Sequence, residues 1–236
     1  MFCKKNILSC KISDGFEIRY NNALGTGSLE TFHNILNQPF AYALYQNKNL
    51  CVHASAIEIN DSAFLFIGLS GGGKSYLLSE LLKYGKFITE DISRITFQDE
   101  IPYIHPSHCL MKLDKLRHTN SEYFSLNTKL SYDNRSRSSY SVKSQYLSFE
   151  PVRIKACILL DFSNTFSIKQ LNEEQSFATL MQSSFKSNPS FCSKGHDIAI
   201  DNQIANLISR TKFYIMKRKK GNSVVGKLVN FIENNL

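Results

Sequence analysis

Residues 50–75 read LCVHASAIEINDSAFLFIGLSGGGKS, and they constrain the fold because they predict how two neighbouring strands are connected. Two runs rich in apolar and β-branched residues flank Asn60 and Asp61, which are both turn-forming residues. Two strands joined by only two such residues form a β-hairpin. The second strand therefore runs antiparallel to the first, and it ends at a glycine-rich segment.

That segment, Gly68-Leu-Ser-Gly-Gly-Gly73-Lys74-Ser75, fits the pattern G-x-x-x-x-G-K-[ST], with a strand before it and a helical sequence, SYLLSELLKYG, after it. Glycines let successive backbone N–H groups turn towards a phosphate, and the start of the helix adds its positive dipole end. Lys74 is expected to reach the β- and γ-phosphates, and the Ser75 hydroxyl to ligate Mg²⁺. The pattern predicts a nucleotide site formed by Gly68, Ser70, Gly71, Gly72, Gly73, Lys74 and Ser75.

The hairpin also places a histidine beside this loop. With Asn60 and Asp61 in the turn, counting back along both strands brings His53 opposite Gly68. A lone histidine on a strand usually has a structural role. The position of His53 at the edge of the phosphate site makes it a candidate for the chemistry as well.

A site for a magnesium–triphosphate complex needs a carboxylate to hold the metal or to accept a proton from the substrate. Two places qualify, because each ends an apolar strand sequence: Glu90-Asp91 after KFIT, and Asp161 after ACILL. Ligands of α/β sheets bind where such strands end. The alternative interpretation of each place is that its acidic residues only cap the strand end at the protein surface.

The rest of the chain predicts alternating strands and helices around one core, which is an α/β fold. FEIRY, 86–97, ACILLDF and FYIM are expected strands, with a turn near QDEIP. Residues 29–45, interrupted by Pro39, 173–185 and 223–236 are expected helices, and the helix after the loop should end at Gly85. Residues 105–150 are polar and serine-rich, and we expect long loops over a short helix there.

Composition limits the possible partners and location. The 236 residues carry a net charge of +8, which favours a polyanionic partner such as a nucleotide, an acidic peptide or nucleic acid. The basic run KRKK at 217–220 is expected to be a solvated turn, so nucleic acid is an unlikely partner. Arg135 and Arg137 in a serine-rich tract are candidates for substrate binding.

Six scattered cysteines without C-x-x-C spacing argue against a zinc site. No apolar run is long enough to span a membrane and no secretory signal is evident, so we expect a cytoplasmic protein.

The pattern from His53-Ala54 through GLSGGGKS and Glu80-Leu-Leu-Lys-Tyr-Gly85 to Ile88-Thr-Glu-Asp91 resembles the catalytic domain of HPr kinase/phosphorylase, a relative of phosphoenolpyruvate carboxykinase. That family has a His-Gly strand, a hairpin, the loop G-x-S-G-x-G-K-S, a glutamate-bearing helix and a strand ending in Asp-Asp. The resemblance covers residues from about 50 to 95. It implies a P-loop fold with a mixed sheet and a hairpin leading into the loop.

The resemblance also implies a serine or threonine kinase that uses ATP and Mg²⁺. On the matching positions, Lys74 and Ser75 bind phosphate and metal, and Asp91 is the base towards the acceptor hydroxyl. His53 matches the active-site histidine. Glu90 stands at the first position of the acidic pair, so the expected metal residues are Ser75, Glu90 and Asp91.

The sequence departs from the bifunctional enzymes at several positions. Glu90 replaces the first aspartate, Tyr76 replaces a glutamate, and Ala54 replaces the glycine after the histidine. Only 52 residues precede His53, and the signature linked to phosphorylase activity is not found. These departures argue against phosphorolysis and against HPr as the substrate.

The compact form is similar to the stand-alone kinases that accompany peptide natural-product pathways, including lasso peptides. We therefore expect residues 1–49 to form a small strand and helix extension, and residues 50–236 to form a P-loop kinase domain. The expected substrate is a hydroxyl, that of a serine, on a peptide or small protein such as a lasso-type precursor. Alternatives are a small-molecule kinase, an HPr-type serine kinase, or a nucleotide-dependent regulatory module without transfer. A homo-oligomer is compatible with the sequence.

Overall fold

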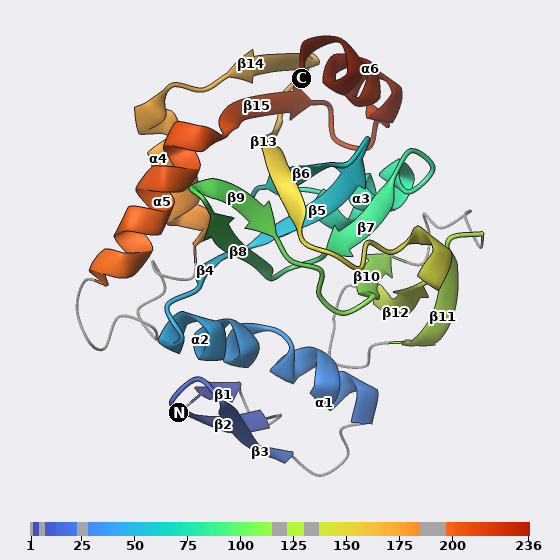
Figure 1. Cartoon of the computed structure of the whole chain (residues 1–236). Coiled ribbons are helices and arrows are strands. Elements are labelled where there is room, and N and C mark those ends of the chain that lie inside the picture. Colours follow the sequence, from blue (N-terminus) through green and yellow to red (C-terminus); the bar gives the residue numbers. More distant parts are fainter. Residues whose placement is uncertain (1, 5–7, 23–27, 115–121, 130–136, 185–196) are drawn as a thin grey trace.

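The structure is a computed structural model that describes residues 2–4, 8–22, 28–114, 122–129, 137–184 and 197–236 (Figure 1). Its centre is a nine-stranded mixed sheet with the order β4-β8-β9-β13-β6-β5-β7, in which β15 lies beside β13 and β14 beside β15. The strands are β4 (Leu50–Val52), β5 (Ala54–Ile59), β6 (Ser62–Ile67), β7 (Lys86–Thr89), β8 (Ser93–Gln98), β9 (Ile101–Ile104), β13 (Val152–Phe162), β14 (Ser167–Gln170) and β15 (Lys212–Arg218). The described elements form the mixed α/β fold that the sequence predicts.

Strands β5 and β6 form the expected hairpin. They pair antiparallel from Ile59 opposite Ser62 to Ala54 opposite Ile67. Asn60 and Asp61 have positive φ angles of 49° and 56°, which the tight hairpin turn requires. The next pair along this register is His53 and Gly68, where the ladder ends and the backbone N–H of His53 instead donates to the carbonyl oxygen of Ser183, at 2.7 Å.

The expected single strand over residues 50–59 is in fact two strands. Residues of β4 pair with β8, whereas residues of β5 pair with β6 and β7. His53 lies at the break between β4 and β5. The side chain of His53 is therefore held where the backbone leaves one set of neighbours for another.

The long strand β13 makes the sheet mixed and gathers strand ends at one edge. It runs parallel to β6 and to β15, and antiparallel to β9. Since parallel strands point the same way, the carboxyl ends of β6, β13 and β15 lie together. The glycine-rich loop follows β6, so this edge holds the candidate site.

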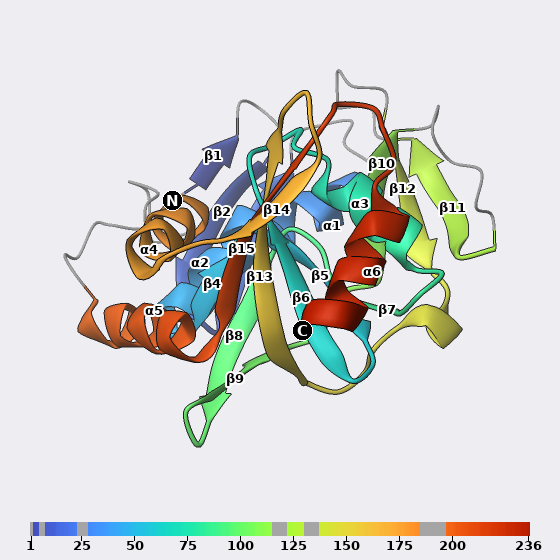
Figure 2. The same ribbon diagram turned by 90° about the horizontal axis from the view of Figure 1, so that it is seen from above.

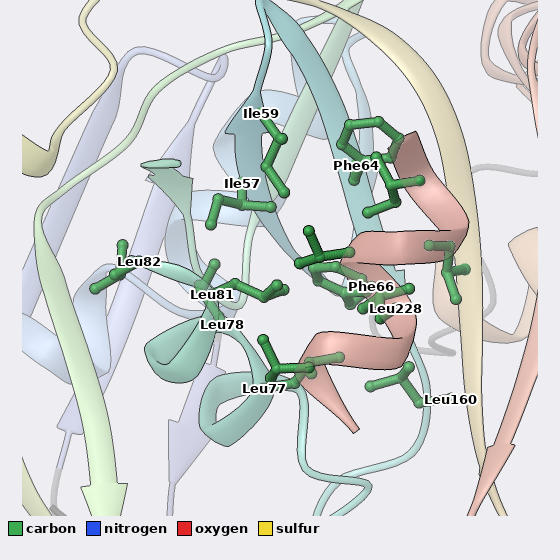
Figure 3. Close-up of a cluster of buried hydrophobic side chains, with 14 of the residues drawn as sticks. Ile57, Ile59, Phe64, Phe66, Leu77, Leu78, Leu81, Leu82, Leu160 and Leu228 are labelled. Carbon is green, nitrogen blue, oxygen red and sulfur yellow. The ribbon is translucent and has the colours of Figure 1, made fainter. Parts of the chain in front are cut away.

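Four helices cover the main sheet. The helices α3 (Lys74–Leu81) and α6 (Val225–Asn235) lie together on one side of it, and α4 (Glu173–Ser183) and α5 (Ile198–Arg210) lie on the other (Figure 2). Side chains of β5, β6, α3 and α6 share one buried apolar cluster, which includes Phe66, Leu78 and Leu228 (Figure 3). Each fully buried side chain of this size stabilises the fold by about 1.5–3 kcal/mol, so this packing fixes α3 against the sheet.

Gly85 does not end the helix as expected. Helix α3 ends at Leu81, and Gly85 does not have the positive φ angle of a glycine cap. A Cβ atom at Gly85 would lie 2.0 Å from the carbonyl oxygen of Glu58. The glycine is therefore needed for the close approach of the turn to β5.

The prediction of long loops over residues 105–150 was wrong for much of that stretch. A three-stranded antiparallel sheet of order β10-β12-β11 occupies it, with β10 (Leu110–Asp114), β11 (Phe124–Lys129), β12 (Arg137–Val142) and a short 3-10 helix, η2 (Ser144–Tyr146). Ser138 and Ser139 on β12 are buried. The serine-rich composition suggested a solvated loop, whereas small buried serines fit a strand covered on both faces.

The described N-terminal residues form a small sheet of β1 (Phe2–Lys4), β2 (Leu8–Ser13) and β3 (Glu17–Asn22), followed by α1 (Ser28–Ile35) and α2 (Gln38–Gln46). In Figure 1 these elements lie together below the main sheet. The break between the helices precedes Pro39, which occupies the first turn of α2, where its missing N–H costs nothing. Within the described residues, no helix is long and apolar enough to cross a membrane.

Candidate active site

The loop between β6 and α3 has a backbone that requires glycine at several positions. Gly71 and Gly73 have φ angles of 83° and 84°, which favour glycine. A Cβ atom on Gly72 would lie 2.9 Å from the carbonyl oxygen of Leu69, so a side chain there would force the loop open. The loop leads directly into the first turn of α3 at Lys74, where backbone N–H groups are left without helical partners.

Lys74 is folded into this loop and is not exposed to solvent as a helix-start lysine would be. Its Nζ atom donates to the carbonyl oxygens of Gly68, at 2.8 Å, and Leu69, at 3.4 Å. Burial lowers the pKa of Lys74, while the nearby charges of Asp91 and Glu90 oppose that shift. The ammonium group thus lies over the first residues of the loop.

Asp91 is held between two basic side chains. Its Oδ1 atom lies 3.4 Å from Nε2 of His53, and its Oδ2 atom lies 3.5 Å from Nζ of Lys112. Asp91 has a φ angle of 66°, a left-handed backbone conformation that is uncommon for residues other than glycine. This conformation occurs just after the end of β7. Burial raises the pKa of Asp91, but the hydrogen bond from His53 and the charges of Lys112, His53 and Lys74 outweigh it and hold the pKa well below its usual range.

Glu90 is buried behind Asp91 and connects it to the loop. Its Oε2 atom accepts a hydrogen bond from the backbone N–H of Lys112, at 3.2 Å. Burial, and then the charge of Asp91, raise the pKa of Glu90 to about 7, while a hydrogen bond with the Ser75 side chain acts in the opposite direction. Glu90 therefore contacts the hydroxyl group that is expected to bind metal.

Lys112 is a residue of the site that the sequence analysis missed. It lies on β10, within the stretch that the composition presented as loop, and its side chain is 13% exposed. Its backbone N–H contacts Glu90 and its ammonium group contacts Asp91. The pattern HPSHCLMKL carried no signal for this role, because only the pairing of β10 with β12 directs Lys112 towards the acids.

Two histidines lie near Lys112. His33 on α1 is buried, and its Nε2 atom is 2.6 Å from the hydroxyl oxygen of Ser139. Burial, and then the charge of Lys112, lower the pKa of His33 to about 4. The same two causes, in the same order, lower the pKa of His108. The N-terminal segment therefore contributes a neutral imidazole close to the acidic pair.

Arg218 is the second residue that the sequence analysis missed. It is buried, its Nη2 atom donates to the carbonyl oxygen of Gly72 at 3.0 Å, and its guanidinium lies 5.4 Å from the ring centre of Phe162. A Cβ atom on Gly73 would lie 2.3 Å from Nη2 of Arg218. The expectation that 217–220 is a solvated turn was wrong for Lys217 and Arg218, because β15 extends through both.

The other predicted residues lie apart from the acidic pair or outside the described chain. Asp161 is half exposed at the end of β13, where it accepts the backbone N–H of Phe162 and lies 3.9 Å from Nζ of Lys217. Arg137 begins β12, opposite Asp114 of β10. Arg135 lies outside the described residues.

The residues present fit a magnesium–nucleotide complex. Gly71 and Gly73 have the positive φ angles that favour glycine, and a Cβ atom on Gly72 would press on the carbonyl oxygen of Leu69. The oxygen atoms of Ser75, Glu90 and Asp91 are the hard donors that Mg²⁺ prefers. Within the described residues, no group of three or more histidine, cysteine or acidic side chains could hold a metal ion by itself.

A cavity of about 320 Å³ adjoins the loop on the side of His53. Its wall consists of loop residues 68–70, residues 159–161 at the end of β13, and Thr179, Gln182 and Ser183 on α4. His53 therefore borders both the cavity and Asp91.

Comparison with known proteins gives distant similarity to solved structures. No protein-family model and no curated protein matches the sequence. Among solved structures, the fold is similar to the HPr(Ser) kinase/phosphatase from Coxiella burnetii, with 10% sequence identity and a TM-score of 0.41, over 78% of this chain and 94% of that chain.

Proposed function

We propose that this protein is an ATP- and Mg²⁺-dependent kinase that phosphorylates a hydroxyl group, that of a serine, on a peptide or small protein. One observation supports the proposal most strongly. The glycine-rich loop holds the buried Lys74, and Asp91 lies between His53 and Lys112. In this proposal residues 50–236 form the kinase domain and residues 1–49 are an extension of it.

When bound, Mg-ATP supplies the phosphoryl group and the metal charge that offsets the developing negative charge. The N–H groups of loop residues 71–75 bind the phosphates, and the ammonium group of Lys74, beside the carbonyl oxygens of Gly68 and Leu69, binds phosphate oxygens as well. Ser75 holds the metal, oriented by Glu90. Asp91 is the third residue of the metal set, at the side facing the acceptor.

Asp91 is also the proposed base. An aspartate with a low pKa is ionised at neutral pH. It accepts the proton of the acceptor hydroxyl as the bond from that oxygen to the γ-phosphorus forms and the bond from the γ-phosphorus to ADP, the leaving group, breaks. His53 and Lys112 hold its two carboxylate oxygens in place through the contacts at 3.4 Å and 3.5 Å. His53 is close enough to Asp91 to donate to the transferring group as well.

The finer substrate assignment rests on the motif resemblance and on charge. The sequence pattern from His53 to Asp91 resembles HPr kinase/phosphorylase, whose superfamily includes the stand-alone kinases of peptide natural-product pathways, so we propose a ribosomal precursor peptide of the lasso type. The net charge of +8 favours an acidic peptide. Glu90 and Tyr76, which depart from the bifunctional pattern, lead us to propose transfer from ATP with little phosphorolysis.

The test is transfer of labelled γ-phosphate from Mg-ATP to a library of short peptides that each contain one serine. We expect the wild type to label a subset of peptides, and both Lys74→Ala and Lys74→Met to abolish labelling. Lys74→Met keeps most of the buried volume, so it separates lost chemistry from lost packing. Lys220→Met, at an exposed lysine outside the loop, is the matched control. Unchanged labelling by Lys74→Met would overturn the assignment of the loop.

A further inference from the structure

We propose that the cavity beside His53 is the acceptor pocket, and that it binds the uncharged residues that flank the phosphorylated hydroxyl. This inference rests on the proposed kinase function and adds the location and chemical selectivity of its second substrate. It concerns the space between loop residues 68–70, the end of β13 and helix α4.

The first argument is the orientation of the phosphate cradle. In such loops the lysine reaches the β- and γ-phosphates, so its ammonium group marks the reactive end of the nucleotide. Nζ of Lys74 lies on the carbonyl oxygens of Gly68 and Leu69, and these two residues line the cavity. The cavity therefore adjoins the end of the phosphate chain where transfer takes place.

The second argument is the position of the proposed base. His53 lines the cavity and also contacts Asp91, with 3.4 Å between Nε2 and Oδ1. A hydroxyl group bound at the His53 side of the cavity therefore lies one side chain away from Asp91. Its volume of about 320 Å³ is at the lower end of ordinary ligand pockets and suits one or two amino-acid residues.

The lining selects the chemistry of the occupant. Ile67, Leu159 and Leu160 supply apolar surface, while Thr179 and Ser183 use their hydroxyl protons on carbonyl oxygens of α4. The one carboxylate in the lining, Asp161, is at the end of β13 near Lys217. The pocket thus suits small, uncharged side chains.

Gln182 is the residue of the lining best suited to bind a peptide backbone. Within the part of the chain that the structure describes, its side-chain amide makes no hydrogen bond to protein. A carboxamide offers one acceptor oxygen and two N–H donors, which match the C=O and N–H groups of a peptide bond. The rigid attachment of this end of α4, through the bond from His53 N–H to Ser183, holds Gln182 in place.

The experiment uses the full chain, Mg-ATP and the serine peptide library, with three variants. Gln182→Trp fills the pocket, Gln182→Ala removes the amide, and Ala178→Trp places the same bulk at an exposed position of α4 outside the lining. We measure KM for the best library peptide and, separately, the affinity for a fluorescent ATP analogue.

We expect Gln182→Trp to raise the peptide KM by about tenfold or more, and Gln182→Ala to raise it less, both with little change in nucleotide affinity. Ala178→Trp should resemble the wild type, and library peptides with charged residues next to serine should be labelled poorly. A loss of nucleotide affinity in Gln182→Trp with an unchanged peptide KM would assign the cavity to the nucleotide base and overturn the inference, as would wild-type values of both. A wild type that binds nucleotide but labels no peptide would overturn the proposed kinase function, and this inference with it.

Discussion

Nη2 of Arg218 donates a hydrogen bond to the carbonyl oxygen of Gly72 at 3.0 Å, across 146 residues of sequence. Because the C=O and N–H of a trans peptide unit point in opposite directions, the N–H of Gly73 points away from Arg218. The bond ties the end of β15 to the loop after β6. A side chain at Gly73 would displace the Arg218 guanidinium, since a Cβ atom there would lie 2.3 Å from Nη2, and it would also be strained by the φ angle of 84°.

Replacing Arg218 should therefore weaken nucleotide binding through the shape of the loop. A hydrogen bond from a charged donor contributes about 1.5–3 kcal/mol, so we expect Arg218→Met to reduce ATP affinity by about tenfold or more. Nucleotide titration followed by calorimetry measures this. Lys219→Met, one residue along and exposed, is the control, and equal affinities in the two variants would show that Arg218 does not brace the loop.

The two strand-end acids should differ sharply in importance. Asp91→Asn should keep nucleotide affinity while the rate of transfer falls by about 10²–10⁴-fold, the usual contribution of general base catalysis. Asp161→Asn should have a milder effect, because Asp161 is exposed and paired with Lys217. Single-turnover rates with labelled ATP distinguish the two, and the reverse ranking would move the base to the end of β13.

His53 should affect the rate more than nucleotide binding. It contacts Asp91 but is not part of the glycine cradle, so His53→Ala should slow transfer without a comparable loss of ATP affinity. His53→Gln, which can still donate to Asp91, should recover part of the rate. Comparing kcat with nucleotide affinity tests this, and a nearly wild-type His53→Ala would return the residue to a structural role.

His33 should make the protein sensitive to acid. Its pKa is about 4 in the fold and about 6.5 in the unfolded chain, so the unfolded state binds the proton first as the pH falls. Stability is then lost between about pH 7 and pH 4, by up to about 3 kcal/mol. His33→Gln keeps a hydrogen-bonding group near Ser139 but cannot take up a proton.

Urea unfolding of the wild type and His33→Gln at pH 7.5 and pH 5 measures this effect. The change in the free energy of unfolding between the two pH values is compared between the two proteins. We expect the wild type to lose more stability than the variant on going to pH 5. Equal losses would show that protonation of His33 does not oppose folding.

Local sequence signals were sufficient to predict the β5–β6 hairpin and the glycine-rich loop that follows it. The hairpin register follows from two turn residues, and both Asn60 and Asp61 take the positive φ angles that such a turn needs. The glycine pattern gives the cradle for a similar reason, since only glycine fits the backbone there. These features depend on residues adjacent in sequence, so they could be predicted without the fold.

Predictions made from amino-acid composition were wrong where burial and strand pairing determine the structure. The serine-rich stretch suggested loops, but Ser138 and Ser139 are buried in β12, and the pairing of that strand with β10 sets where Lys112 points. The end of the P-loop helix was also misplaced, because Gly85 is required by its contact with Glu58 and not by a helix cap. Such demands come from neighbours distant in sequence.

Short-range spacing and backbone preference encode the hairpin, the glycine-rich loop after β6 and the two acids that follow β7, so all three could be read from the sequence. The contacts of Lys112 with Glu90 and Asp91, and the bond from Arg218 to Gly72, depend on the assembled fold. The physical reason is that these contacts join β10 and β15 to the loop and to β7. No local pattern specifies which charged side chain will be buried against them until the sheet is assembled.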